Sequence, residues 1–169
     1  MSAFPDWQKF AVKQKRDATG CIPTGFEILL RAAGAGGICF DTFQDDFDLD
    51  QDGGTPRNHF VSVADEVKKK YPNVAFTCKA FEKGKGDAKL EFVEKMISNQ
   101  RPVVVSIAQR PEGGWHIMPV VDSNSDTLVL LHHVDDNGTP QVETIAKTEF
   151  IDRHNNWKGG EEICYLERC

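Results

Sequence analysis

Long apolar runs are missing from this sequence of 169 residues. No stretch of about 18 consecutive apolar residues occurs, so we predict no membrane-spanning helix. Met1 to Phe10 hold no apolar run of the signal-peptide type, which leads us to expect a cytoplasmic protein. Basic residues are outnumbered, with 20 Lys and Arg against 26 Asp and Glu. The net charge of -6 gives no general attraction for phosphate backbones, which argues against nucleic acid as the main partner.

Paired cysteine motifs are also missing. The cysteines number five and show no CxxC spacing, which disfavours a zinc knuckle and a disulfide framework and leaves at least one free thiol. No group of His, Cys and carboxylate residues has metal-ligand spacing, so we expect neither a metal nor another cofactor. The run from Asp48 to Gly53 resembles the start of a calcium loop. His59 stands where that loop needs a glutamate, so a solvated acidic loop is favoured.

A core-forming composition is present. Hydrophobic residues make up 40% of the chain, and we predict one domain over residues 1–169. Apolar residues spaced three and four apart predict helices over 22–33, 60–71 and 87–97. Alternating or continuous apolar runs predict strands at 74–78, 103–108, 115–121, 127–133, 142–146 and 161–166. Helices first and sheet second predict an α+β domain.

Several local features complete this outline. The segment 43–58 is polar, acidic and glycine-bearing, so we predict a loop there, with Asn58 as the N-cap of the next helix. Pro119 interrupts a predicted strand, and because proline cannot donate to a sheet ladder we expect it at an edge or a bulge. We predict a short helix over 148–153.

Cys21 opens the first predicted helix, directly after Gly20. The N-terminal end of a helix carries partial positive charge, which favours the reactive thiolate form of cysteine. The apolar stripe that follows indicates a helix packed firmly along its length, with its first turn open to a cleft. The alternative interpretation is a small buried hydrophobic residue.

Two further residues fit chemistry at that thiol. His116 begins an apolar strand after two glycines, and an imidazole is the base that a thiol nucleophile needs. Gln14 precedes Cys21, and its amide can donate to an oxyanion beside the backbone N–H of Cys21. Taken singly, a histidine satisfied within a sheet and a solvated glutamine are the simpler interpretations.

The order glutamine, cysteine at a helix start, histidine at a strand start resembles the papain-like cysteine peptidases. The nearest resemblance is to their compact bacterial branch, the C39 family, and it covers the chain from about Val12 to the last strand. The matching segments are 14–24, 101–107 and 115–121. The resemblance implies a papain-like fold, with Cys21 as nucleophile, His116 as base and Gln14 as oxyanion donor.

The chain departs from the family pattern at two positions. Ile22 follows the cysteine where the family has glycine, and a bulkier side chain there would narrow the cleft. Where the family spacing places an Asp or Asn that orients the histidine, this chain has His132. We predict His132 as this third residue, then Asp135. In a regular strand His132 and His133 point to opposite faces, so only one of them would face the cleft.

Three functions agree with these residues. The first is a cysteine-dependent peptidase or amide hydrolase that acts on a peptide or protein substrate. The second is a catalytically inactive papain-like module that binds a peptide or a partner protein, which the departures at Ile22 and His132 suggest. The third is an acyl transferase on the same scaffold. Family members that cleave leader peptides usually belong to a transporter, so such a role here would require a separate transporter protein.

Overall fold

A computed structural model describes residues 6–16, 20–48 and 56–168. A 3-10 turn at Trp7–Lys9 precedes the main elements. These are, in chain order, α1 (Cys21–Ala32), α2 (Phe40–Phe47), α3 (Pro56–Lys70), β1 (Ala75–Ala80), α4 (Gly86–Ser98), β2 (Val103–Ala108), β3 (Trp115–Ser123), β4 (Thr127–Val134), β5 (Pro140–Ala146), α5 (Lys147–Asn156) and β6 (Glu162–Arg168).

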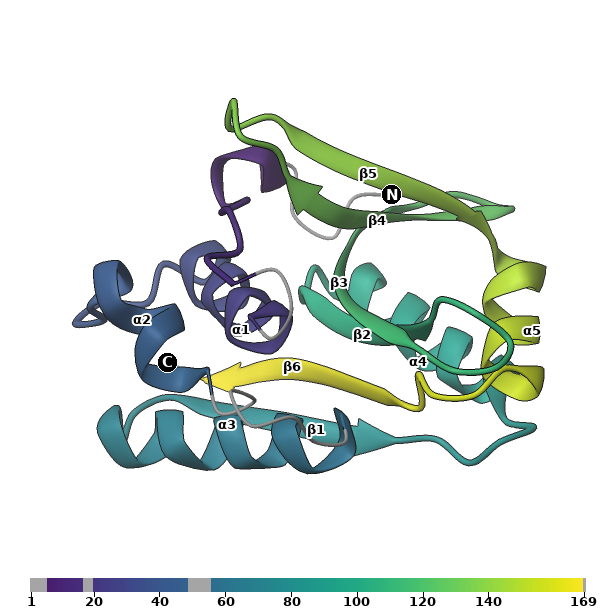
Figure 1. The fold of residues 1–169 in the computed structure, drawn as a ribbon, viewed down its shortest axis with the longest axis horizontal. Coiled ribbons are helices and arrows are strands. Elements are labelled where there is room, and N and C mark those ends of the chain that lie inside the picture. The colour runs from purple at the N-terminus through teal and green to yellow at the C-terminus, as the bar shows by residue number, and fades with distance from the viewer. Residues whose placement is uncertain (1–5, 17–19, 49–55, 169) are drawn as a thin grey trace.

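The strands form one antiparallel sheet in the order β1-β6-β2-β3-β4-β5 (Figure 1). On one face of the sheet α1 covers the central strands, α3 covers β1 and β6, and α2 packs against α1 and α3. Helices α4 and α5 cover the other face. The observed architecture is therefore mixed helix and antiparallel sheet, as the order of apolar patterns predicted. The β4–β5 hairpin lies at one end of the sheet and β1 at the other.

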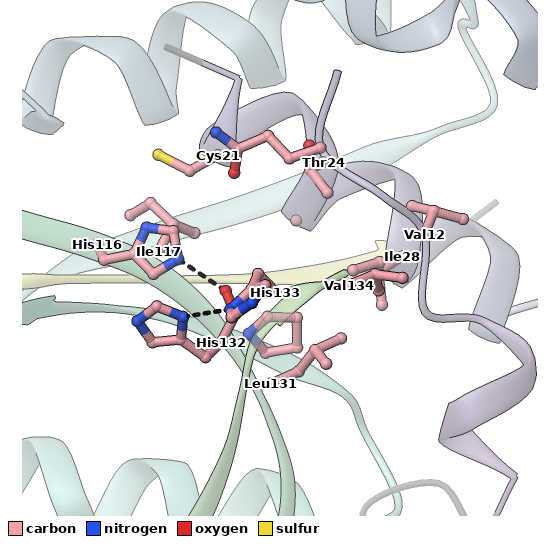
Figure 2. A pocket seen from close by; sticks show the side chains of 13 residues that line it. Val12, Cys21, Thr24, Ile28, His116, Ile117, Leu131, His132, His133 and Val134 are labelled. Atoms are coloured by element: carbon pink, nitrogen blue, oxygen red, sulfur yellow. Dashed lines mark hydrogen bonds between the residues drawn. The ribbon is translucent and has the colours of Figure 1, made fainter. Parts of the chain in front are cut away.

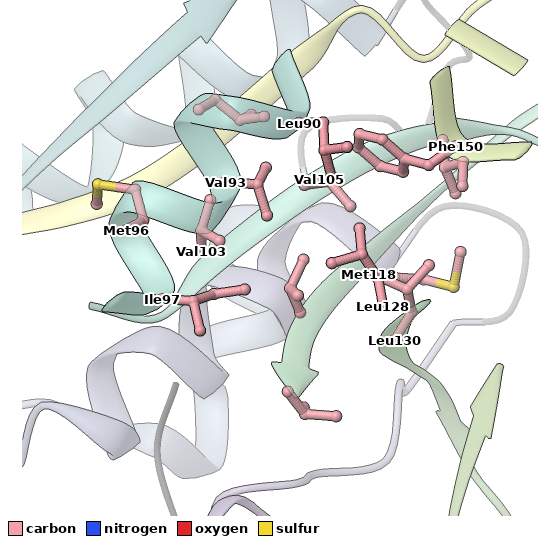
Figure 3. Close-up of a cluster of buried hydrophobic side chains, with 14 of the residues drawn as sticks. Leu90, Val93, Met96, Ile97, Val103, Val105, Met118, Leu128, Leu130 and Phe150 are labelled. Atoms are coloured by element: carbon pink, nitrogen blue, oxygen red, sulfur yellow. The ribbon is translucent and has the colours of Figure 1, made fainter. Parts of the chain in front are cut away.

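Strand β2 is apolar at every position except Ser106. All six of its residues are buried. Val104 belongs to the apolar cluster under α1, α2 and α3, whereas Val103 and Val105 belong to the cluster under α4 and α5. Successive side chains of a strand point to opposite faces, so a strand covered on both faces favours apolar residues throughout, and five of the six residues of β2 are apolar. Figure 3 shows the second cluster, where Val93 and Ile97 of α4 meet β2.

The predicted loop over 43–58 is wrong at both of its ends. Residues 40–47 form helix α2, and Asn58 lies inside α3, which begins at Pro56. In α2, the side chains of Phe43 and Phe47 are buried one turn apart. The helix buries one narrow aromatic stripe and exposes acidic residues elsewhere, so its overall polarity concealed it. Most of the calcium-loop resemblance, including residues 49–53, lies outside the described residues.

Pro119 sits in β3, an interior strand, rather than in an edge strand. It pairs with Val104 of β2, but the pairing of β3 with β4 begins only at Val120 and is irregular between Val120 and Asp122. The first half of β3 is therefore open on its β4 side, and Pro119 lies where a donor to β4 is not needed. This local separation of two neighbouring strands creates the pocket described next.

Candidate active site

A pocket opens between α1, the first half of β3 and the end of β4 (Figure 2). Cys21, Gln14, His116 and His132, the four residues predicted for the site, all line it. The fold thus brings together residues from the N-terminal segment, a helix and two strands. A wider groove continues from the pocket over Lys13, Lys15 and Asp136.

Helix α1 places Cys21 at the pocket through its close packing on the sheet. Cys21, Gly25 and Ile28 lie on one helical face and all line the pocket. A Cβ atom on Gly25 would lie 2.9 Å from Cγ1 of Val104 and 3.3 Å from Cγ2 of Ile117. The absence of a side chain at Gly25 therefore allows α1 to approach β2 and β3 closely, which brings Cys21 near the start of β3.

Cys21 is the first residue of α1 and is half-buried. The hydroxyl of Thr24 lies 2.6 Å from the carbonyl oxygen of Gly20 and donates to it, which fixes the first turn. The aligned backbone dipoles of the helix place partial positive charge at this end, which stabilises a thiolate.

His116 points into the same pocket from β3, and its Nε2 lies 2.9 Å from the carbonyl oxygen of His132. A carbonyl oxygen only accepts hydrogen bonds, so Nε2 must carry the proton. In the neutral imidazole Nδ1 then holds the lone pair, and Figure 2 shows this second ring nitrogen on the side of the ring that faces Cys21. Burial lowers the pKa of His116, which keeps the ring neutral and able to accept a proton.

His132 forms its hydrogen bond with His116 through its backbone carbonyl, which differs from the expected contact, and the two rings lie tilted with their centroids 5.1 Å apart. The pairing of β4 with β5 is irregular between Leu131 and His133, so β4 carries an extra residue there, as in a β-bulge. The strand is therefore not regular, and both His132 and His133 line the pocket. Their Nδ1 atoms lie 2.8 Å apart, so the His132 ring is engaged with its neighbour.

Asp135 was the alternative prediction for the residue that orients His116, but its carboxylate forms hydrogen bonds within the turn after β4. Its carboxylate accepts hydrogen bonds from the backbone N–H groups of Asn137 and Thr139, both at 2.9 Å. It therefore closes the turn between β4 and β5. The neighbouring Asp136 pairs with Lys13. Among the residues that the structure describes, no carboxylate forms a hydrogen bond with the His116 ring.

Gln14 is half-buried, and its Nε2 donates to the carbonyl oxygen of Arg16 at 2.6 Å. This bond folds the glutamine side chain back over the turn that leads to Cys21. A Cβ atom on Gly20 would lie 3.2 Å from Cγ of Gln14, which shows how closely the glutamine approaches the start of α1.

Gln44 of α2 supports the candidate site without lining the pocket, a role that the sequence did not reveal. It is buried, and its Oε1 accepts from the backbone N–H of Lys15 at 2.9 Å while its Nε2 donates to the carbonyl oxygen of Lys13 at 3.0 Å. The backbone on both sides of Gln14 is therefore held by one amide. The same Nε2 donates to buried Glu27 of α1 at 2.9 Å. A single glutamine inside a predicted loop carries no signal of this role.

Ile22 does not narrow the pocket. Its side chain is 2% exposed and belongs to the apolar cluster under α1, α2 and α3. It points away from Cys21 because neighbouring residues of a helix are directed about 100° apart. The larger side chain at this position therefore packs in the hydrophobic core and leaves the pocket unchanged.

No group of three or more His, Cys, Asp or Glu side chains within residues 6–16, 20–48 and 56–168 could hold a metal ion. None of the helices in the described part of the chain has the length and apolar character needed to cross a membrane.

The arrangement is that of a papain-like peptidase fold. No protein-family profile and no curated protein sequence matches this chain. A solved structure does match: the peptidase domain of Streptococcus ComA, a bi-functional ABC transporter involved in a quorum-sensing pathway. The TM-score is 0.57 at 14% sequence identity, and the match covers 95% of this chain and 99% of that one. The predicted α+β, papain-like fold is thereby confirmed.

Proposed function

We propose that this protein is a cysteine-dependent peptidase or amide hydrolase. The observation that carries the proposal is the shared pocket of Cys21 and His116, in which the carbonyl oxygen of His132 fixes the proton on Nε2 of His116. The imidazole is thereby held in the tautomer that accepts a proton on the side of the thiol. The papain-like fold, shared with a peptidase domain, supports the same reaction class.

In the proposed reaction, Nδ1 of His116 accepts the thiol proton and the sulfur of Cys21 attacks the carbonyl carbon of the substrate. The backbone N–H of Cys21 and the amide of Gln14 donate to the resulting oxyanion. His116 then gives its proton to the leaving amine, and water hydrolyses the acyl-enzyme. An amide nitrogen carries two donors, so the bond from Gln14 to Arg16 is compatible with a second bond to the oxyanion.

A peptide is the substrate class that the surroundings favour. The groove beside the pocket carries cationic Lys13 and Lys15 together with the carboxylates of Asp135 and Asp136. An extended chain has backbone donors and acceptors that such a mixed polar groove can satisfy. ComA joins its peptidase domain to a transporter. We propose by analogy that a separate transporter or partner protein presents the substrate here.

A binding module without catalysis is the second candidate. The observation that favours it is the third position, where a carbonyl oxygen rather than a carboxylate faces His116. A carbonyl oxygen orients the ring but carries no full negative charge, so it stabilises the imidazolium less. The burial that lowers the pKa of His116 acts in the same direction.

Acyl-enzyme formation distinguishes the two candidates. The full chain is mixed with p-nitrophenyl acetate, and release of p-nitrophenol is followed while mass spectrometry locates the acetyl group. A peptidase is expected to give a burst, with the acetyl group on Cys21, and the burst should disappear in Cys21→Ala and His116→Ala. Cys39→Ala is the matched control, because this exposed thiol lies outside the pocket and its loss should leave the burst intact. Equal acetylation of Cys21 in the wild type and in His116→Ala would refute the proposal.

A further inference from the structure

Two cysteines outside the active site face each other across the sheet. Cys78 of β1 and Cys164 of β6 are direct partners in the antiparallel register, and their sulfur atoms lie 3.4 Å apart. Both are free thiols. Neither lines the pocket of Cys21. The proposed peptidase reaction therefore leaves this pair unused.

The backbone geometry suits a covalent bond between them. Residues directly opposite each other on antiparallel strands have Cα atoms about 4.5–5.5 Å apart, and disulfides span Cα separations of about 4.4–6.8 Å. The sulfur atoms must approach from 3.4 Å to about 2 Å, which rotation of the two side chains supplies without moving either strand.

We propose that Cys78 and Cys164 are a redox pair that forms a reversible disulfide between β1 and β6. Cys164 is fully buried in the apolar cluster beneath α1, whereas Cys78 is partly exposed at its border. An oxidant from solvent therefore reaches Cys78 first, and Cys164 is the thiol that resolves the oxidised product. Burial raises the pKa of Cys164, which keeps it a protonated thiol until Cys78 has reacted.

The chemistry balances with a peroxide as oxidant. The sulfur of Cys78 attacks one oxygen of hydrogen peroxide, the O–O bond breaks, and the products are a sulfenic acid and water. The sulfur of Cys164 then attacks the sulfur of Cys78, the S–O bond breaks, and hydroxide leaves with the proton of Cys164 as a second water. A dithiol reductant reverses the bond by attack at the accessible sulfur of Cys78, and the dithiol becomes a disulfide.

The disulfide would join the edge strand β1 covalently to its neighbour β6. Strand β1 is an edge strand with β6 as its neighbour, and α3 packs on both strands. On its other side, Cys164 is the register partner of Val104 in β2, and Gly25 of α1 packs closely against Val104. A cross-link here closes a long chain loop in the unfolded state, which raises the stability of the folded form. We expect the oxidised protein to melt at least about 5 °C above the reduced protein.

The test treats the full chain with hydrogen peroxide, blocks the remaining thiols with iodoacetamide, and digests the protein without reduction. Mass spectrometry is expected to find a peptide pair joined through Cys78 and Cys164, and dithiothreitol should release it. The cross-link and the rise in melting temperature should both be absent in Cys78→Ala. Both should persist in Cys39→Ala, a matched control whose thiol is exposed and does not belong to the Cys78–Cys164 pair.

Recovery of Cys78 as a sulfinic acid, or joined to Cys39 or Cys169, would overturn the proposal. So would a cross-link that forms only after the protein is unfolded, or one that forms in the native protein without raising its melting temperature. These outcomes do not depend on peptidase activity, because the readouts are a covalent bond and a melting temperature.

Discussion

The hydrogen bonds of Gln44 predict that a residue of α2 controls catalysis at a distance. Gln44 contacts the backbone of Lys13 and Lys15 and the carboxylate of Glu27, and its Oε1 lies 2.9 Å from the hydroxyl of Thr24. A net contribution of about 1 kcal/mol for each of the two neutral hydrogen bonds to Lys13 and Lys15, and about 2 kcal/mol for the bond to Glu27, gives roughly 4 kcal/mol for the group. Gln44→Met keeps the length of the side chain and removes these bonds.

We expect Gln44→Met to lose that stability and also to slow ester acylation of Cys21 by roughly 10- to 100-fold. The second effect follows because the segment that carries Gln14 is no longer held, and displacement of an oxyanion donor by about 1 Å costs rates of this order. Alkylation of Cys21 by iodoacetamide forms no oxyanion, so its rate should change little. Asp46→Ala is the matched control, because Asp46 lies on the outer side of the same helix.

A double-mutant cycle decides whether Gln44 acts through Gln14. Rates of acylation by p-nitrophenyl acetate are measured for the wild type, Gln14→Ala, Gln44→Met and the double variant, below the melting temperature of each. If Gln44 positions Gln14, the second substitution should add almost nothing once Gln14 is absent. Rate losses that multiply in the double variant would show that Gln44 is structural only and would refute the reasoning.

Three further outcomes follow from other contacts. His132→Ala should keep kcat/KM within about threefold, because the carbonyl oxygen rather than the ring holds His116; a larger loss with an intact fold would assign the orienting role to the ring. Gly25→Val should lower stability to urea by about 2–3 kcal/mol and reduce acylation, because the new side chain meets Val104 and displaces α1; unchanged values would contradict the close packing. Burial lowers the pKa of Lys89 to about 7, while the unfolded chain keeps this proton to about 10.5, so Lys89 should add about 1.4 kcal/mol per pH unit to the free energy of unfolding between these values. Denaturant titrations should show a wild-type slope that exceeds the slope of Lys89→Met by this amount, and equal slopes would exclude it.

The acid limit of the proposed activity should depend on His116. The base must be unprotonated to accept the thiol proton, and burial lowers its pKa below the ordinary value of 6.5. Activity should therefore persist below pH 6.5 and fall as the pH drops through the lowered pKa. A pH profile of acylation by p-nitrophenyl acetate measures this limb, and a midpoint above 6.5 would contradict the inferred burial effect.

The sequence predicted the parts of the fold that depend on local pattern. The mostly apolar run of β2 is recognisable because both of its faces are buried, and the stripe of α1 is recognisable because a period of 3.6 residues follows from burial on one helical face. Helix α2 was not predicted, because only a narrow stripe of it, with Phe43 and Phe47 at the centre, contacts the core. Its remaining positions are polar and resemble a loop.

The candidate site likewise has side chains that the sequence predicted and contacts that it did not. Cys21 and His116 were predicted from their chemistry and from their positions at the start of a helix and a strand, and both line one pocket. The contact between His132 and His116 could not be identified, because it arises from a β-bulge that turns a backbone carbonyl into the pocket. Backbone groups carry no sequence signature, and neither does the buried amide of Gln44.

The pH dependence of Cys21 alkylation tests the pairing of thiol and imidazole most directly. Iodoacetamide labelling of Cys21 is measured by mass spectrometry from pH 5 to 10 in the wild type and in His116→Ala, with Cys39 as the internal reference. Pairing predicts that Cys21 reacts faster than an ordinary thiol near neutral pH, and that His116→Ala moves its profile toward the ordinary cysteine pKa of about 8.5 while Cys39 stays unchanged. Profiles of Cys21 that coincide in the two proteins would contradict the account.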